Sequence, residues 1–489
     1  MFVHREKKVH LGLILLGIFV LFVGGASAAG YYFIKNTNPA EILSMGLVQK
    51  ELTKKIGEEH TNLIADLPNW VGLTEPKTYL PLFLNNTELR PGGGFIGSYA
   101  VLRLDQGRAE VLQVEGSEAL DRAADRAKLP APPEVLKVHL GVNNWFFRDS
   151  NWSPDFAESS QKTLELYTLE NGVAAADIDA VIGVTTHVLE EIMKRTGPIT
   201  IQGIEFKAEN VIEKLEYEVE YGYKDRGIDF RDRKNVLGEL FHEFVRRLGP
   251  DAVRHPADYA ALMDKLATEK HILAYAPEAE VQKKFAAYGW AGTFVPTSTD
   301  YVFWVDANLA ALKTDYAMVR SLGYGIKKDS DGRLVGVVHM SYQNTGKFDW
   351  RTTRYRTYSR VFVPLGSELM TVNGSLAWDR TNKPGEVNVE TINGHQVFGA
   401  FISIEPGETK SLSFTYRLAS QVVAAIEKGE YSVLIPKQLG TEAHSLTLNL
   451  DFGTTITGAE PAEAKEDWGN SIYTIKTDLR VDRYFAVKL

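Results

Sequence analysis

Hydrophobic and polar positions follow two different periods along the chain, and the change of period divides it. Between residues 76 and 291, apolar runs typical of buried strands alternate with segments of helical spacing. The run Ala180–Val184 is continuously apolar, as in a strand buried on both faces. Residues 186–196 then follow with helical spacing and end at Gly197. This alternation predicts an α/β layered domain over residues 76–291.

Stretches of period two dominate from residue 292 to the end. Examples are Val335–Tyr342, Ser411–Tyr416 and Ser445–Leu450, and turn signals such as Asp331-Gly332 and Asn393-Gly394 separate them. Many short strands at regular spacing are typical of an all-β domain built from two packed sheets. The pattern therefore predicts an immunoglobulin-like β-sandwich over residues 292–489.

The N-terminal segment is apolar and long. No Asp, Glu, Lys or Arg occurs from Val9 to Ile34, and the charged residues before this run are mainly basic. Such a run spans a hydrocarbon core of about 30 Å, and the basic flank predicts a cytoplasmic N-terminus. A cleaved signal peptide is the alternative, because Ala26-Ser27-Ala28 fits a cleavage site. The length favours an uncleaved transmembrane anchor over residues 1–35, and both interpretations export the rest of the chain.

Residues 36–75 predict a helical stalk between the anchor and the α/β domain. Pro39 suits the first turn of a helix, and apolar residues from Ile42 to Ile56 follow at near-helical spacing. Pro68 and Pro76 are expected to end this pattern.

The composition of the chain excludes several classes of function. The chain has a formal net charge of −9 and no cysteine. An acidic chain is a poor partner for nucleic acid, which needs clustered Lys and Arg. Disulfides, thiolate metal sites and a cysteine nucleophile are excluded. A cysteine-free exported chain suits a bacterial cell envelope, so we expect a single-pass plasma-membrane protein whose bulk is extracytoplasmic.

A polar loop with three glycines lies between two predicted strands and is the first candidate site. Its residues are Asn85, Asn86, Glu88, Arg90, Gly92, Gly93 and Gly94. The forked donors of Arg90, helped by the glycine amides, would suit a phosphate or carboxylate. A buried Glu–Arg pair that holds a tight turn explains the same residues equally well. The loop lacks the Gly-Lys-Ser/Thr of a nucleotide-binding P-loop.

A second polar cluster occupies residues 148–156. Arg148 could bind an anion, and the oxygen of Asp149 could bind a hard cation. The alternative is turn chemistry with a helix N-cap at Ser153 or Asp155.

The third cluster, residues 224–233, precedes a predicted helix that starts at Asn235. Arg231 and Arg233 are unfavourable for the helix dipole there unless they meet an anion or a carboxylate. The alternative is an ordinary solvated face of mixed charge. The 11 histidines are scattered without ligand spacing, and His242-Glu243 lacks the second histidine of a zinc protease motif.

Several strings resemble a bacterial family known as domain of unknown function 4012. They are LPLFLNNTELRPGGGFIGSYAVLRLDQGR, RDSNWSPDF, TGPITI and VDANLAALKTDY. The resemblance runs from about residue 76 to residue 450, and the family name implies no activity.

Residues 164–201 also resemble the LytR-CpsA-Psr family, and GIDFRDRKNVLGELFHEFVRRL is similar to its arginine-bearing helix start. That family transfers glycans from lipid pyrophosphates to the cell wall, using arginines and acids around a divalent ion such as Mg²⁺. The resemblance implies Arg90, Arg231 and Arg233 as the arginines, with Asp121 as the nearest acid. The sequence departs from the family at Pro91–Gly94, where the family has Ser-Asp.

Two hypotheses for function follow. In the first, the exported domain binds or transfers a polyprenyl-pyrophosphate-linked glycan, or contacts a wall polymer, through its arginines with Asp149 or Asp121 assisting a cation. In the second, the chain is a non-catalytic surface or assembly protein with a degenerate transferase-like scaffold, and the β-sandwich makes the contacts. Arginines converging on one cleft would favour the first, whereas arginines each neutralised by a neighbouring carboxylate in packed sites would favour the second.

Overall fold

The computed structural model describes residues 50, 61–106, 108–230, 233, 235–295 and 299–489. Two compact units share these residues, and neither is continuous in sequence. The first unit holds the described residues up to Leu84 with residues 96–125 and 164–291, and the second holds residues 85–95, 126–163 and 292–489. The chain therefore passes between the units five times, whereas the sequence pattern predicts continuous domains that meet at residue 291.

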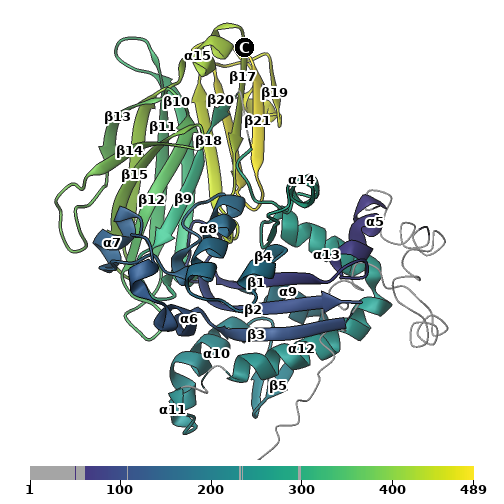
Figure 1. The fold of residues 1–489 in the computed structure, drawn as a ribbon. Coiled ribbons are helices and arrows are strands. Elements are labelled where there is room, and N and C mark those ends of the chain that lie inside the picture. Colours follow the sequence, from purple (N-terminus) through teal and green to yellow (C-terminus); the bar gives the residue numbers. More distant parts are fainter. Residues whose placement is uncertain (1–49, 51–60, 107, 231–232, 234, 296–298) are drawn as a thin grey trace, which may run out of the picture. The chain divides into compact units, whose positions relative to one another are not determined.

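The first unit is built on a mixed five-stranded sheet of order β3-β2-β1-β4-β7 (Figure 1). Its strands are β1 (Lys77–Asn85), β2 (Phe95–Asp105), β3 (Arg108–Gly116), β4 (Ala180–Thr185) and β7 (Ile272–Tyr275). Strands β1 and β4 pair in parallel, whereas β2 pairs with β3, and β4 with β7, in antiparallel fashion. A separate hairpin joins β5 (Ile199–Ile201) to β6 (Ile204–Phe206).

Helices pack against this sheet in two hydrophobic cores. The first unit's helices are α5 (Thr61–Trp70), α6 (Ser117–Ala123), α9 (Thr186–Thr196), α10 (Val211–Tyr217), α11 (Tyr223–Asp225), α12 (Asn235–Arg254), α13 (Pro256–Thr268) and α14 (Ala279–Ala287). One core joins β2 to α9, α10, α12 and α13 through residues such as Leu102, Ile192 and Leu240. A smaller core joins β4 and β7 to α14 through Ala180, Ala274 and Phe285.

The second unit contains three β-sheets. The six-stranded sheet has the order β13 (Glu368–Asn373), β16 (Thr409–Arg417), β11 (Leu334–Asn344), β10 (Met318–Lys328), β18 (Ser445–Asp451), β20 (Ile472–Asp478). One four-stranded sheet has the order β14 (Val387–Ile392), β15 (His395–Ile404), β12 (Tyr355–Pro364), β9 (Phe303–Asn308). The other has the order β19 (Gly458–Glu460), β21 (Arg483–Lys488), β17 (Glu430–Ile435), β8 (Asp300–Tyr301).

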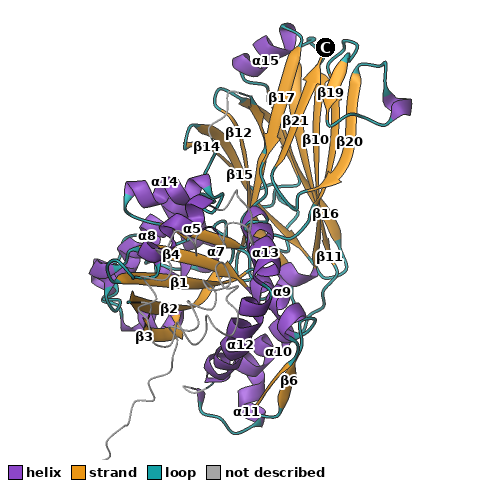
Figure 2. Ribbon diagram, turned by 90° about the vertical axis from the view of Figure 1, so that its right-hand side faces the viewer, coloured by secondary structure: helices purple, strands orange, loops and turns teal. Residues whose placement is uncertain are grey.

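The sheets of the second unit share one large hydrophobic core, and their strands are drawn in orange in Figure 2. Alternate residues of β11 and β16, such as Met340 and Phe414, meet residues of β12 and β15, such as Val361 and Phe398, in this core. Short helices α7 (Glu134–Leu140) and α15 (Ser420–Glu427) complete the unit, and α8 (Phe156–Leu169) contains the passage between units at residue 163.

The predicted mixed α/β region followed by many strands is confirmed. Helix α9 begins and ends where the pattern places it, with Gly197 at its C-cap at a φ of 78°. The turn signals Asp331-Gly332 and Asn393-Gly394 both connect antiparallel strands, β10 to β11 and β14 to β15. The expectation that Pro68 ends the stalk helix is wrong, because Pro68 lies inside α5, two residues before its end.

The predicted transmembrane segment, Val9–Ile34, and most of the predicted stalk lie outside the described residues. Within the described part of the chain, no helix has the length and hydropathy required to cross a bilayer.

Candidate functional site

The glycine loop between β1 and β2 belongs to the second unit and is buried there. The amide of Gly92 donates to the carbonyl of Asn151 at 3.0 Å, and the amide of Gly93 donates to the carbonyl of Arg90 at 3.0 Å. The side chain of Asn151 donates in return to the carbonyl of Gly94. These loop amides therefore face carbonyls of the protein itself, and not an open anion cradle.

The glycines are required by close approach of backbone to backbone. Gly94 has a φ of 154°, and a Cβ there would lie 2.7 Å from the carbonyl carbon of Asn85. Gly440, at a φ of 75°, passes so near the loop that a Cβ would lie 1.7 Å from the oxygen of Gly93. Only glycine fits such contacts without moving one of the two backbones.

Arg90 is 3% exposed and is held by several groups of the second unit. Its Nε donates to Oδ1 of Asp149 at 3.1 Å, and Nη1 donates to the carbonyl of Asn308 at 2.8 Å. Oε1 of Glu88 lies 3.5 Å from Nη2, and the ring of Phe95 lies against the guanidinium, 5.1 Å from its centre. Burial lowers the pKa of Arg90, but the charges of Asp149 and Glu88 raise it by more. The arrangement is a buried ion pair.

The remaining polar residues of the loop also have partners in the second unit. Oδ1 of Asn85 accepts hydrogen bonds from the amide and hydroxyl of Thr87, and Asn86 donates to the carbonyl of Gly440 at 3.1 Å. Oε2 of Glu88 pairs with Lys313 at 2.7 Å. The predicted substrate-binding residues of the loop are thus brought together, and the contacts described for them are made with the protein.

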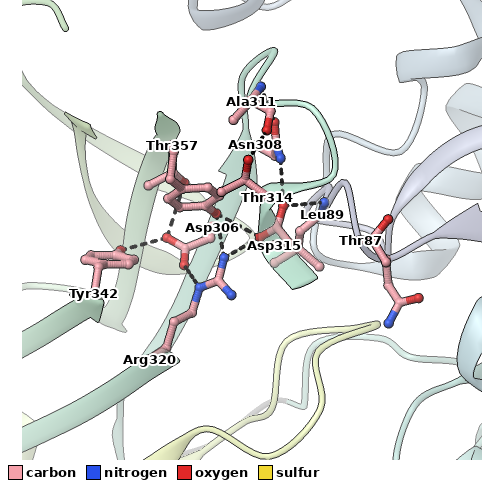
Figure 3. Close-up of polar contacts among 12 residues, drawn as sticks. Thr87, Leu89, Asp306, Asn308, Ala311, Thr314, Asp315, Arg320, Tyr342 and Thr357 are labelled. Atoms are coloured by element: carbon pink, nitrogen blue, oxygen red, sulfur yellow. Dashed lines mark hydrogen bonds and ion pairs between the residues drawn. The ribbon is translucent and has the colours of Figure 1, made fainter. Parts of the chain in front are cut away.

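A buried charge network, which the sequence did not indicate as a site, lies beside the loop. Arg320 on β10 lies between Asp306 and Asp315, and all three side chains are less than 5% exposed (Figure 3). Its Nε donates to Asp306 at 3.1 Å, and Nη2 pairs with Asp315. Oδ2 of Asp315 accepts from the amide of Leu89 at 2.9 Å and from Nδ2 of Asn308 at 2.7 Å. The network therefore binds the loop to the start of the β-sheet region.

The second carboxylate of this network is surrounded by donors. Oδ1 of Asp306 accepts hydrogen bonds from Trp304 at 3.1 Å, Tyr342 at 2.8 Å and Ser359 at 2.8 Å. Burial raises the pKa of Asp306, and Arg320 and these donors counteract the rise. Gln438 connects the two sites, since its Nε2 donates to the carbonyls of Asp306 and Arg90. A buried network satisfied in this way organises structure more readily than it reacts.

Asp306 and Asp315 both lie within the string VDANLAALKTDY. The resemblance of this string to a family assigns no role to either residue. Their common partner Arg320 follows that string. No spacing rule in the sequence links these residues to residues 85–95.

The second predicted cluster is largely turn and cap. Asp155 precedes α8, and its Oδ1 accepts from the amide of Glu158 at 3.0 Å, as a helix N-cap does. Phe156 is buried at 1% exposure. The side chain of Arg148 is 34% exposed, lies 3.7 Å from Asp149, and stacks on the ring of Phe146. Arg148 is therefore the predicted site residue of the second unit that solvent reaches most readily.

The other predicted residues lie in the first unit or outside the description. Arg233 is 8% exposed, pairs with Glu118 of α6, and lies 3.6 Å from Glu220. Asp121, also on α6, is 4% exposed. Arg231 lies outside the described residues. Their roles in binding or catalysis stay predictions.

Comparison with solved structures finds weak likenesses. A Legionella pneumophila protein described as a "putative nutrient binding protein" is 8% identical, with a TM-score of 0.25 over 39% of this chain and 71% of that chain. An M1 zinc metallopeptidase from Deinococcus radiodurans is 11% identical, with a TM-score of 0.17 over 37% of this chain and 43% of that one. Likenesses at these scores carry no argument about fold or function.

No curated protein matches the chain significantly. A family model does match, at residues 74–220, which include β1, the glycine loop and β4. The predicted resemblance is confirmed there: residues 74–220 match the model of the family described as protein of unknown function (DUF4012).

Proposed function

We propose that the chain is a membrane-anchored, extracytoplasmic protein of the bacterial cell envelope that acts as a non-catalytic surface or assembly protein. In this proposal the first unit is a degenerate scaffold related to LytR-CpsA-Psr transferases. The β-sheets form an immunoglobulin-like sandwich that contacts the partner, which is a wall polymer, a lipid-linked glycan or another envelope component.

The observation that carries the proposal is the neutralisation of the arginines. Arg90 is buried against Asp149 and Glu88 within the second unit, and Arg233 is buried against Glu118 within the first. A transferase needs its guanidinium donors aimed at a developing phosphate charge. Donors already bound to carboxylates would have to break buried ion pairs before they could bind pyrophosphate, and each break is strongly destabilising.

The envelope location rests on sequence alone. The uncharged run Val9–Ile34 with its basic flank supports an anchor with the bulk outside. The lack of cysteine is consistent with an exported bacterial chain.

The test is complementation of a deletion strain by variants at predicted binding and catalytic positions that keep Arg90 itself. Arg148→Ala removes the arginine of the second cluster, and Asp121→Asn removes the nearest acid at constant shape. We expect both variants to restore wall-glycan content to the wild-type level, because no transfer step depends on them. Loss of glycan to the level of the deletion strain would contradict the proposal and favour a transferase.

The comparison requires equal amounts of exported protein. Ser330→Cys adds one thiol in the exposed turn between β10 and β11 of a chain that has none of its own. A membrane-impermeant maleimide then reports the exported amount of each variant in intact cells. Failure of the otherwise wild-type Ser330→Cys chain to label in intact cells, with labelling after lysis, would contradict the extracytoplasmic location.

A further inference from the structure

Two histidines and a glutamate meet in the first unit, although His187 lies 82 positions before Glu269 in the sequence. The donor atoms of His187, Glu269 and His271 all lie within 4.8 Å of one another. The imidazole rings of His187 and His271 lie 4.5 Å apart, centre to centre, at an angle of 39°. His271 is 1% exposed and Glu269 is 5% exposed. Nitrogen and carboxylate donors gathered at this range match the ligand set of a zinc-class ion.

The helix end before β7 positions two of the three residues. Glu269 caps α13, and Lys270 adopts a left-handed conformation with a φ of 56°. The amide of His271 donates to the carbonyl of Leu266 at 2.7 Å, and that of Lys270 donates to Ala267 at 2.9 Å. These two bonds form a Schellman C-cap. A non-glycine residue in the left-handed region costs roughly 1–2 kcal/mol, so the surrounding structure must hold this turn.

The third residue comes from the neighbouring strand end. His187 is the second residue of α9, which starts directly after β4, the strand paired with β7. Thr185, the last residue of β4, donates its amide to the carbonyl of His271 at 3.0 Å. Its hydroxyl also lies 2.9 Å from Nδ1 of His271. Histidines that bind metals commonly have one ring nitrogen engaged in this way.

The charges around the cluster favour a cation. Oε2 of Glu190 lies 3.2 Å from Nδ1 of His187, and Oε1 of Glu191 lies 3.7 Å from its Nε2. Glu191 is in turn paired with Lys194 and with Lys265, the latter at 2.7 Å. Glu190 and Glu269 therefore add negative charge beside two imidazoles that bind a metal in their neutral form.

We propose that His187, Glu269 and His271 bind one zinc-class divalent ion in the first unit. Zn–N and Zn–O bonds are about 2.1 Å long, so donors on one tetrahedral ion lie roughly 3.5 Å apart. The three side chains need to close by on the order of 1 Å to reach that arrangement, a movement within the reach of the half-buried His187. The ion joins the start of α9 to the connection between α13 and β7. The site goes beyond the proposed assembly function and does not depend on it.

The test is zinc binding by the purified full-length chain, kept in mild detergent because of its apolar N-terminal segment. After chelator treatment and dialysis, we expect one zinc per chain with a dissociation constant below micromolar by competition with a chromophoric chelator. Zinc should also raise the unfolding temperature, since it binds the folded chain preferentially. His187→Ala should weaken binding by about 100-fold or more, given that even outer-sphere changes cost 10–100-fold.

Two further variants make the result specific. Glu269→Gln keeps the shape of a buried ligand and should also weaken binding strongly. His339→Ala, an exposed histidine of the second unit, should leave affinity and stoichiometry unchanged. Absence of zinc uptake by the wild-type chain would show that the cluster is only a hydrogen-bonded group, and wild-type affinity in both His187→Ala and Glu269→Gln would place any bound zinc elsewhere. Either result overturns the proposal.

Discussion

Single arginines decide how the glycine loop is interpreted. Arg90 and Arg320 carry full charges at 3% and 6% exposure, and each lies between two carboxylates. The polar contacts described for both arginines are made with other groups of the protein. Arg90, for example, donates to the carbonyl of Asn308. From sequence, a Glu–Arg pair and an anion clamp were equally consistent with Arg90. The sequence marks Arg90 as a residue of interest. Its partners Asp149 and Asn308 lie 59 and 218 positions away, and no local sequence pattern indicates such pairings.

A buried acid of the second unit should make stability depend on pH. Burial raises the pKa of Asp300 to about 6, although Tyr324 and Tyr431 donate hydrogen bonds to it. The folded state therefore holds its proton more tightly than the unfolded state, whose pKa is near 3.9. Stability from this group is fully present below pH 4 and is lost as the pH rises toward and through 6. Between pH 5 and pH 7 the loss should be about 1 kcal/mol.

Asp300→Asn isolates this effect, because the amide cannot ionise. The free energy of unfolding of Asp300→Asn minus that of the wild type, measured by urea denaturation, should rise by about 1 kcal/mol from pH 5 to pH 7. A difference that stays constant or falls over this range would show that Asp300 does not titrate there.

At the scale of elements, the sequence pattern predicts the turns but not the packing of the glycine loop. Helix α9 and the hairpins at Asp331-Gly332 and Asn393-Gly394 follow from local periodicity and turn chemistry, which depend on neighbours in sequence. The glycines after Arg90 were attributed to turn freedom or ligand approach. The actual neighbours are the backbone of Asn85 at Gly94 and that of Gly440 at Gly93, and only the folded chain brings Gly440 near.

Two glycines with the same backbone angle separate these explanations. Gly440 and Gly394 both have a φ of 75°, but a Cβ at Gly440 would strike the oxygen of Gly93, while nothing lies within 4 Å of one at Gly394. Gly394→Ala should cost about 1 kcal/mol, from the left-handed conformation alone. Gly440→Ala should cost at least about 2 kcal/mol more, because a backbone must move. Thermal unfolding of the two variants gives the comparison, and equal losses would mean that the close approach is unimportant.

At the scale of the whole molecule, the chain passes five times between its two compact units. The change of hydrophobic period at residue 292 located only the last passage. Residues 85–95 and 126–163 belong to the second unit, whose sheets come later in the sequence. The hydrophobic period of a segment does not show which distant part of the chain it packs against. The cluster of His187, Glu269 and His271 was not predicted for the same reason. Glu269 and His271 are close in sequence, but His187 lies on another element, and a spacing pattern reveals a ligand set only when all its members share one helix or loop.

The central claim is that the glycine loop with Arg90 is part of the folded core of the second unit. The direct test is urea unfolding of the full-length chain carrying Arg90→Met, with Arg148→Met as the matched control at a side chain that is 34% exposed. The account predicts a loss of about 3–5 kcal/mol for Arg90→Met, because the buried carboxylates of Asp149 and Glu88 lose the guanidinium between them, and only the more exposed Arg148 remains near Asp149. The control should lose less than about 1 kcal/mol. Wild-type stability in Arg90→Met would contradict the account and return the loop to the role of a binding site.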